Sequence, residues 1–170
     1  APCMVVLGLL LLAACFGVVG QTVRRWFPQT SAAAYLLAVA AVVLGSQLYY
    51  LLVRPYIYEY AILCGAALLM LGLWLWLSAA NTPVEKRGAI LAKLAFGSLF
   101  AALVAGCRPQ MELFAFLAVP IFWQRYIGQK RLCSRAGAGE AAAFILPVVV
   151  VAAGLMWYNA ARFGSPLDFG

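Results

Sequence analysis

Six long apolar runs, separated by short polar gaps, dominate this sequence. A helix that crosses the hydrocarbon core of a membrane needs about 20 mostly apolar residues, whereas strands are rarely longer than about ten residues. The expected fold is therefore an all-α membrane protein, a polytopic bundle of about six transmembrane helices in one domain, 1–170. The predicted spans are residues 1–20, 32–53, 60–80, 89–107, 110–124 and 141–158.

Composition supports the bilayer as the main partner of this chain. Hydrophobic residues make up 66% of it and charged residues only 10%, whereas soluble domains are roughly half apolar and a quarter charged. The absence of histidine excludes the HExxH metalloprotease motif and the Ser-His-Asp triad. The net charge of +7 is spread over gaps between apolar runs, so we expect no nucleic-acid partner. The five cysteines form no CxxC pair and no metal-binding spacing.

Basic residues crowd every second gap. The gaps 21–31, 81–88 and 125–140, with Lys93 just beyond the second, hold nine of the twelve lysines and arginines. The other gaps hold one arginine each, at Arg54, Arg108 and Arg162. The positive-inside rule then places the basic gaps in the cytoplasm and both chain ends on the extracytoplasmic side. Because no basic segment precedes the first run, we expect an internal fragment of a longer protein.

The fifth run, 110–124, is short for a membrane span. As an α-helix it covers only about 22 Å of a core about 30 Å thick. We expect a short span with Arg108 and Arg125 snorkelling to its two ends. It also contains Pro120, and a short helix interrupted by proline is typical of a binding site, although simple mismatch with the bilayer explains it equally well.

The gaps with single arginines share a pattern that suggests an anion site. In each gap an acid follows the arginine, as in Arg54 and Glu59, Arg108 and Glu112, and Arg162 and Asp168. Three guanidinium groups on one side of a membrane can converge on a phosphate. Pro55 and Pro109 favour helix starts beside two of the arginines, where free N–H groups also attract anions.

The carboxylates of these gaps could act as a base, hold sugar hydroxyls or bind a divalent metal, although the sequence identifies no cofactor. The alternative reading of the gaps is structural. Glu59 and Glu112 fall in predicted first helical turns, where a carboxylate stabilises the helix dipole in any case. The arginines would then contact only lipid headgroups.

Three segments, RPYIYEYAILCGAALLMLGLW, AGCRPQ and YNAARFGSPLDFG, resemble bacterial membrane proteins of the GT-C glycosyltransferase superfamily. The likeness is to the dolichyl-phosphate-mannose–protein mannosyltransferase-like group, and it covers residues 53–74, 105–110 and 157–170. The resemblance implies sugar transfer from a polyprenyl-phosphate donor at the outer face of the bacterial cytoplasmic (inner) membrane.

The resemblance also implies roles for individual residues. The acidic catalytic residue of such proteins lies in the first outer loop, which would be upstream of this chain, so the catalytic residue is unknown here. The implied substrate-binding residues are Arg54, Arg108 and Arg162 around the donor phosphate, with Tyr58, Glu59, Glu112 and Asp168 in support.

Two other function classes stay open. A transporter or lipid flippase buries ionisable residues near the membrane midplane, and the interiors of the predicted spans hold none. A non-catalytic membrane scaffold would need none of the three arginines.

Overall fold

The computed structural model describes residues 2–53, 56–128 and 134–167, and every regular element within these ranges is a helix. In chain order the elements are α1 (Pro2–Trp26), α2 (Ala32–Gly45), α3 (Leu48–Val53), α4 (Ile57–Asn81), α5 (Arg87–Cys107), the 3₁₀-helix η1 (Pro109–Leu117), α6 (Ala118–Phe122), the π-helix η2 (Trp123–Gly128) and α7 (Arg135–Phe163).

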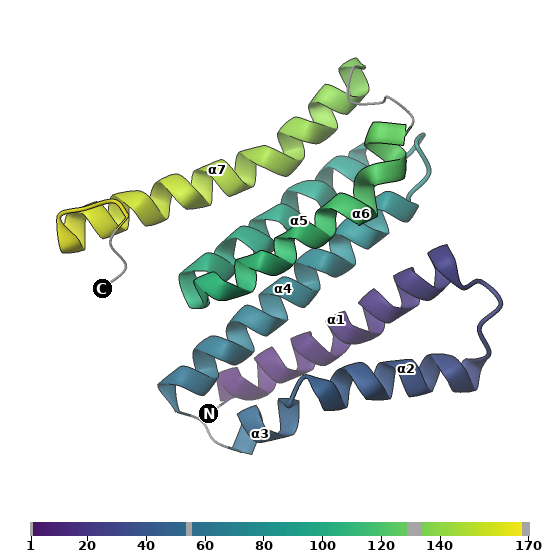
Figure 1. The fold of residues 1–170 in the computed structure, drawn as a ribbon, viewed down its shortest axis with the longest axis horizontal. Helices are drawn as coiled ribbons and strands as arrows, with labels where there is room; N and C mark the ends of the chain where they lie inside the picture. The colour runs from purple at the N-terminus through teal and green to yellow at the C-terminus, as the bar shows by residue number, and fades with distance from the viewer. Residues whose placement is uncertain (1, 54–55, 129–133, 168–170) are drawn as a thin grey trace.

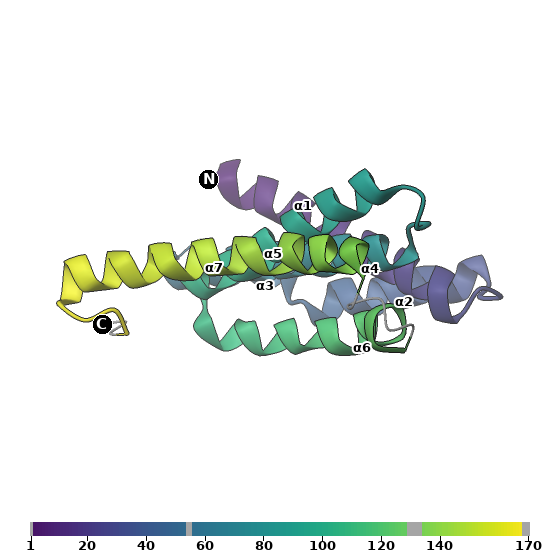
Figure 2. The same ribbon diagram turned by 90° about the horizontal axis from the view of Figure 1, so that it is seen from above.

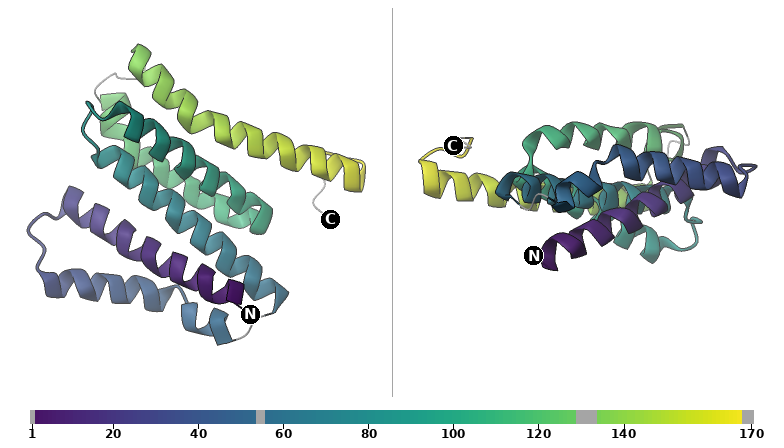
Figure 3. Two further views of the ribbon diagram at one scale, coloured as in Figure 1. Left: turned by 180° about the vertical axis from the view of Figure 1, so that it is seen from behind. Right: turned by 90° about the horizontal axis from the view of Figure 1, so that it is seen from below.

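The helices form one main layer with a shorter second layer on one face. In Figure 1 the layer runs in the order α2, α1, α4, α5 and α7. Figure 2 shows η1 and α6 on one face of this layer, where they contact α4 and α5. The view from behind in Figure 3 shows α7 at one edge of the layer and α2 at the other. Neighbours in space are therefore often distant in sequence, as α1 and α4 are.

Four of the described helices are long and apolar enough to cross a membrane. They are α1, α4, α5 and α7, with mean hydropathies between 2.0 and 2.7 over their most apolar stretches. Large apolar side chains are exposed on the surface, including Ile57 at 87% and Leu44 at 79%. Such a surface suits lipid and not water. The predicted all-helical class and the membrane-compatible helices are confirmed, while six complete spans are not.

The predicted span over 32–53 is wrong as a single helix. Helix α2 ends at Gly45 and α3 begins at Leu48. Between them, Gln47 has a φ of 54°, in the left-handed region that interrupts a right-handed helix. Ser46 closes the preceding turn by donating its hydroxyl to the carbonyl of Val43 at 2.6 Å. Hydropathy does not detect this break, because the residues on both sides are equally apolar.

The predicted α-helix over 110–124 is also wrong in its winding. The segment starts as the 3₁₀-helix η1, with Pro109 at its first position, and becomes α-helical only at Ala118. A 3₁₀-helix rises about 2.0 Å per residue, against about 1.5 Å in an α-helix. The stretch Pro109–Phe122 is therefore about 25 Å long, where a wholly α-helical stretch would be about 21 Å. The 3₁₀ winding compensates for part of the missing length.

Close packing of α4 against α5 forms the rigid centre of the bundle. A Cβ added to Gly72 would lie 2.9 Å from the carbonyl oxygen of Gly97, so the two backbones touch here. One turn further on, the buried indole of Trp76 donates to the Ser98 hydroxyl at 3.2 Å. The Trp76 ring also packs on Phe144 of α7, with ring centroids 5.2 Å apart. These contacts fix α7 to the central pair.

Candidate functional site

The described gap residues lie at two opposite ends of the bundle. Figure 1 shows the end of α1, the end of α4 and the start of α7 together at one end, which we call the basic end because Arg25, Lys86 and Arg125 lie there. The starts of α4 and η1 and the last turns of α7 lie at the other, the single-arginine end, with Arg108 and Arg162. The membrane sides that we assign to these ends remain a prediction.

At the single-arginine end, Arg108 lies at the junction of α5 and η1. Its extended backbone, with a φ of −152°, ends α5 and precedes η1. The guanidinium carbon lies 6.0 Å from the centroid of the Tyr58 ring in the first turn of α4. The fold thus brings together two predicted site residues that are 50 positions apart in the sequence. Arginine over an aromatic face keeps most of its N–H donors available.

Glu112 lines a cavity of about 230 Å³ beside this junction. The cavity lies between α5, η1 and α7, and its walls include Ala105, Pro109, Glu112, Val151, Leu155 and Asn159. The Glu112 Oε1 atom is buried and has no hydrogen-bond partner among the described residues. No ion pair joins Glu112 to Arg108 in this part of the chain, although the sequence suggested that pairing.

Asn159 is a site residue that the sequence analysis did not single out. It is 5% exposed, lines the same cavity as Glu112, and its amide nitrogen is 3.5 Å from the carbonyl of Pro166. The sequence does point to this residue, because Asn159 belongs to the YNAARFG segment that carries the family resemblance. Charge and aromatic character, the two features used to select residues in the gaps, do not select an asparagine.

Of the other predicted residues that the structure describes, Arg162 and Glu59 are not among those that line this cavity. Figure 2 shows the last turns of α7 projecting beyond the other helices, and Arg162 is exposed there. Its Nη1 donates to the Tyr158 hydroxyl at 2.7 Å, and no contact with Arg108 occurs in the described part. Glu59 lies partly buried in the first turn of α4. Arg54 and Asp168, two predicted ligands, and Pro55 lie outside the described residues.

The single-arginine end does not assemble a metal site from the residues that the structure describes. No three cysteine, aspartate or glutamate side chains gather anywhere within the ranges 2–53, 56–128 and 134–167. Glu112 is the one carboxylate on the wall of the cavity. The suggestion of a divalent metal therefore gains no support here, and the available chemistry is hydrogen bonding by Glu112, Asn159 and Arg108.

At the basic end, Arg125 and Glu140 are buried, which sequence analysis did not predict. Arg125 was expected to snorkel at a helix end, but it is 8% exposed, and Glu140, assigned to a loop, is 1% exposed within α7. The reason is tertiary packing, since Arg125 Nη1 donates to the carbonyls of Ala79 at 3.0 Å and Thr82 at 3.1 Å, at the end of α4. The last turn of α4 carries no basic residue to satisfy these carbonyls.

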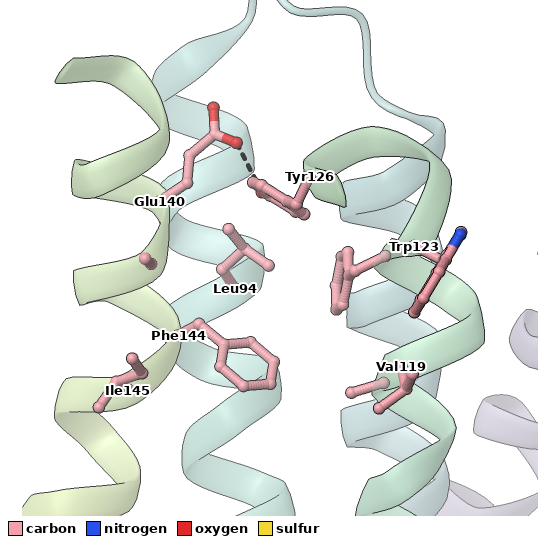
Figure 4. Close-up of a pocket in the computed structure, with 10 residues that line it drawn as sticks. Leu94, Val119, Trp123, Tyr126, Glu140, Phe144 and Ile145 are labelled. Carbon is pink, nitrogen blue, oxygen red and sulfur yellow. Dashed lines mark hydrogen bonds between the residues drawn. The ribbon is translucent and has the colours of Figure 1, made fainter. Parts of the chain in front are cut away.

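A second cavity of about 300 Å³ lies beside this buried pair. Figure 4 shows it between the segment that carries Val119 and Trp123 and the α7 segment that carries Phe144 and Ile145, with Glu140 pointing toward Tyr126. The Tyr126 hydroxyl donates to Glu140 Oε2 at 2.5 Å. Apart from these two residues the lining is mainly aliphatic and aromatic, so this cavity offers packing surface and little chemistry.

A scan against protein-family models, a search of curated proteins and a search of solved structures find no match to this chain. The resemblance to GT-C glycosyltransferases thus rests on the three short segments alone.

Proposed function

We propose that this chain is part of a membrane glycosyltransferase of the GT-C type, which binds a polyprenyl-phosphate-linked sugar at the single-arginine end. In this proposal that end faces the extracytoplasmic side of a bacterial inner membrane. The observation that carries it is Glu112 on the wall of a mostly apolar cavity, with a buried carboxylate oxygen that has no hydrogen-bond partner among the described residues.

The lining of the cavity suits an amphiphilic ligand. Val148, Val151, Leu155 and Met156 form an apolar wall along α7, and Glu112 with Asn159 supplies the polar atoms. Ligand pockets usually combine a mainly apolar lining with a few polar groups that fix orientation. A sugar hydroxyl donating to Glu112 Oε1 would satisfy an atom that is costly to leave unpaired. The lipid tail would follow the apolar wall of α7.

We assign the donor phosphate to Arg108, which is next in sequence to the cavity wall but is not one of the lining residues. It immediately precedes Pro109, which lines the cavity, and its guanidinium is held over the Tyr58 ring. Guanidinium groups bind phosphate through two parallel hydrogen bonds. Arg162 would be a weaker contributor, because it lies on the projecting end of α7 and is already bonded to Tyr158.

The test is photochemical labelling with a defined probe, since the acceptor is unknown. The full-length protein in membranes is incubated with a polyprenyl-phosphate mannose that carries a diazirine near the phosphate. We expect Glu112→Gln and Arg108→Ala each to reduce labelling roughly tenfold or more, as the loss of a charge-assisted hydrogen bond implies. Glu85→Gln is the matched control, because Glu85 is an exposed carboxylate near the basic end.

Two outcomes would reject this function. One is absence of specific labelling in the unaltered protein, and the other is equal labelling of the Glu112→Gln and unaltered proteins. Competition by unlabelled polyprenyl-phosphate sugar distinguishes specific labelling from partition into the bilayer. Loss of labelling in Glu85→Gln as well would indicate a general charge effect.

A transporter or lipid flippase is the second candidate, and one observation favours it. Arg125 and Glu140 are ionisable residues buried at the basic end of the bundle, not at its middle, and membrane proteins often retain buried ionisable residues for function. Reconstitution in proteoliposomes with a fluorescent polyprenyl phosphate separates the classes. Movement of the lipid between leaflets without sugar transfer supports the flippase, and neither activity supports a scaffold.

A further inference from the structure

At the basic end, two arginines from distant parts of the chain line one cavity of about 420 Å³. Arg25 reaches it from the last turn of α1, and Arg125 from η2. The rest of the wall is the end of α4 and the turn after it, including Asn81, Thr82 and Pro83. This cavity is separate from the one at Glu112, which lies at the other end of the bundle.

Arg125 is held rigidly but keeps unused donors. Its Nη1 donates to the carbonyls of Ala79, Ala80 and Thr82 at 3.0, 3.3 and 3.1 Å. Its Nε and Nη2 are buried and have no hydrogen-bond partner in the described part of the chain. The Glu140 carboxylate, already bonded to Tyr126, is 3.9 Å from Nε, too far for a hydrogen bond. Capping of α4 thus accounts for Nη1 and the ion pair with Glu140 for Nε, which leaves Nη2 without an assigned partner in the described part of the chain.

Arg25 is fixed on the other side of the same cavity. Its Nη1 is 3.4 Å from Asn81 Oδ1, and its Nη2 donates to the carbonyl of Ile121 at 3.2 Å. Asn81 is itself held by Gln21, whose side-chain oxygen accepts from Asn81 Nδ2 at 2.9 Å. A third cation is close, since the Lys93 ammonium donates to the Thr82 hydroxyl at 2.8 Å.

The charges around this cavity do not balance. Arg25, Arg125 and Lys93 contribute three positive groups. The carboxylate that contacts them among the described residues is Glu140, which lies 3.9 Å from Arg125 Nε. Glu85 lies in the neighbouring turn, but it is exposed and makes no ion pair within the described residues. Like charges held close together in a partly buried place repel one another. An anion between the two guanidinium groups would reduce this repulsion and could accept from Nη2 of Arg125.

We propose that the Arg25–Arg125 cavity binds a phosphate group, either the headgroup of an anionic phospholipid or a soluble phosphate. Two guanidinium groups favour tetrahedral oxyanions, to which each can donate more than one hydrogen bond. Because the cavity is at the basic end, the positive-inside rule places it at the cytoplasmic surface. The proposal is independent of the function proposed for the single-arginine end.

Native mass spectrometry of the purified full-length protein tests the site. The protein is released from nanodiscs that contain phosphatidylcholine alone or with phosphatidylglycerol, and retained phosphatidylglycerol is counted in the presence and absence of inorganic phosphate. We expect one retained anionic lipid, with affinity reduced roughly tenfold in Arg25→Ala and in Arg125→Lys. Arg24→Ala is the matched control, since Arg24 is an exposed arginine in the same helical turn, and should bind normally.

The arms of this experiment separate the two sources of phosphate. Displacement of the lipid by inorganic phosphate, or saturable phosphate binding in phosphatidylcholine alone, identifies a soluble ligand, and retention of the lipid identifies a headgroup site. An equal loss in Arg24→Ala would overturn the proposal, because it would indicate general attraction to anionic surfaces. So would the absence of saturable binding of either probe. Arg25→Ala keeps the test decisive if Arg125→Lys fails to fold.

Discussion

The two ends of this bundle use the same residue type in different ways. At the basic end, Arg125 is buried and tied to backbone carbonyls of α4, while Arg25 bridges Asn81 and Ile121. At the single-arginine end, Arg108 and Arg162 contact aromatic side chains, and neither side chain donates to a backbone carbonyl of the described residues. The arginines of the basic end therefore brace the scaffold with part of their donors while lining a cavity, whereas those of the single-arginine end are held beside aromatic rings.

The largest expected effect is on chemical labelling from the two sides of the membrane. In a protein without native cysteines, Gln110→Cys and Lys86→Cys place a thiol at the single-arginine and the basic end. We expect a membrane-impermeant maleimide added to intact cells to label Gln110→Cys and not Lys86→Cys, because basic loops stay in the cytoplasm. Labelling both in permeabilised cells is the control, and the reverse pattern would invert the proposed orientation.

The next largest effect should be on stability at the basic end. Arg125→Ala removes the side chain that donates to three backbone carbonyls. It also removes the arginine partner of Glu140. Breaking a buried pair in this way costs about 3–5 kcal/mol. Unfolding in mixed detergent micelles measures it, with the exposed Arg135→Ala as the control. A change below about 1 kcal/mol, typical of surface pairs, would show that Arg125 is not structural.

Both ends depend on the central pair α4 and α5, which Gly72→Ala should disturb. The new methyl group would meet the Gly97 carbonyl at 2.9 Å, and overpacking of this kind costs about 1–3 kcal/mol. Gly154→Ala is the control, because a Cβ there meets nothing within 4 Å. If both substitutions leave unfolding unchanged in detergent micelles, the close backbone contact is not needed for stability.

Glu112→Gln should have a smaller effect on stability than on ligand binding. Glutamine keeps the shape and removes the charge from an oxygen that has no partner in the described structure. We therefore expect unfolding to shift by no more than about 1 kcal/mol, while labelling by the polyprenyl-phosphate probe falls. Destabilisation comparable to that of Arg125→Ala would mean that Glu112 belongs to the scaffold.

The smallest effect is expected for Arg162→Ala. This side chain is exposed on the last turn of α7. Its hydrogen-bond partner, Tyr158, is four residues earlier on the same helix. Such pairs contribute little, so thermal unfolding should not change measurably. A clear loss would reveal a contact between α7 and the rest of the bundle beyond those described.

The sequence predicted the helical class and the positions of the four long helices, because apolar length is a strong signal. It did not predict the break at Gln47 or the 3₁₀ winding of η1, because both depend on backbone angles that side-chain hydropathy does not encode. At the site, Arg108 and Glu112 were identified from their charge. Asn159 was not, because its role becomes clear only when α7 is packed beside η1.

Arg125 and Glu140 show the same limit at the basic end. Their positions beside apolar runs suggested solvated flanks, since a charge near a helix end usually reaches water. What buries them is a need elsewhere in the chain, the carbonyls at the end of α4. Only the tertiary arrangement of α4, η2 and α7 shows that a donor is required there.

The winding of η1 has a geometric consequence for the two cavities of the second layer. With three residues per turn, Pro109, Glu112, Ala115 and Ala118 fall in one straight row. This row begins at the Glu112 cavity and reaches the aromatic cavity of Figure 4 at Ala118. Rewinding the segment as an α-helix would rotate Glu112 relative to Ala118 by roughly 120°. The 3₁₀ winding is therefore what places the Glu112 carboxylate at the first cavity while Ala118 lines the second.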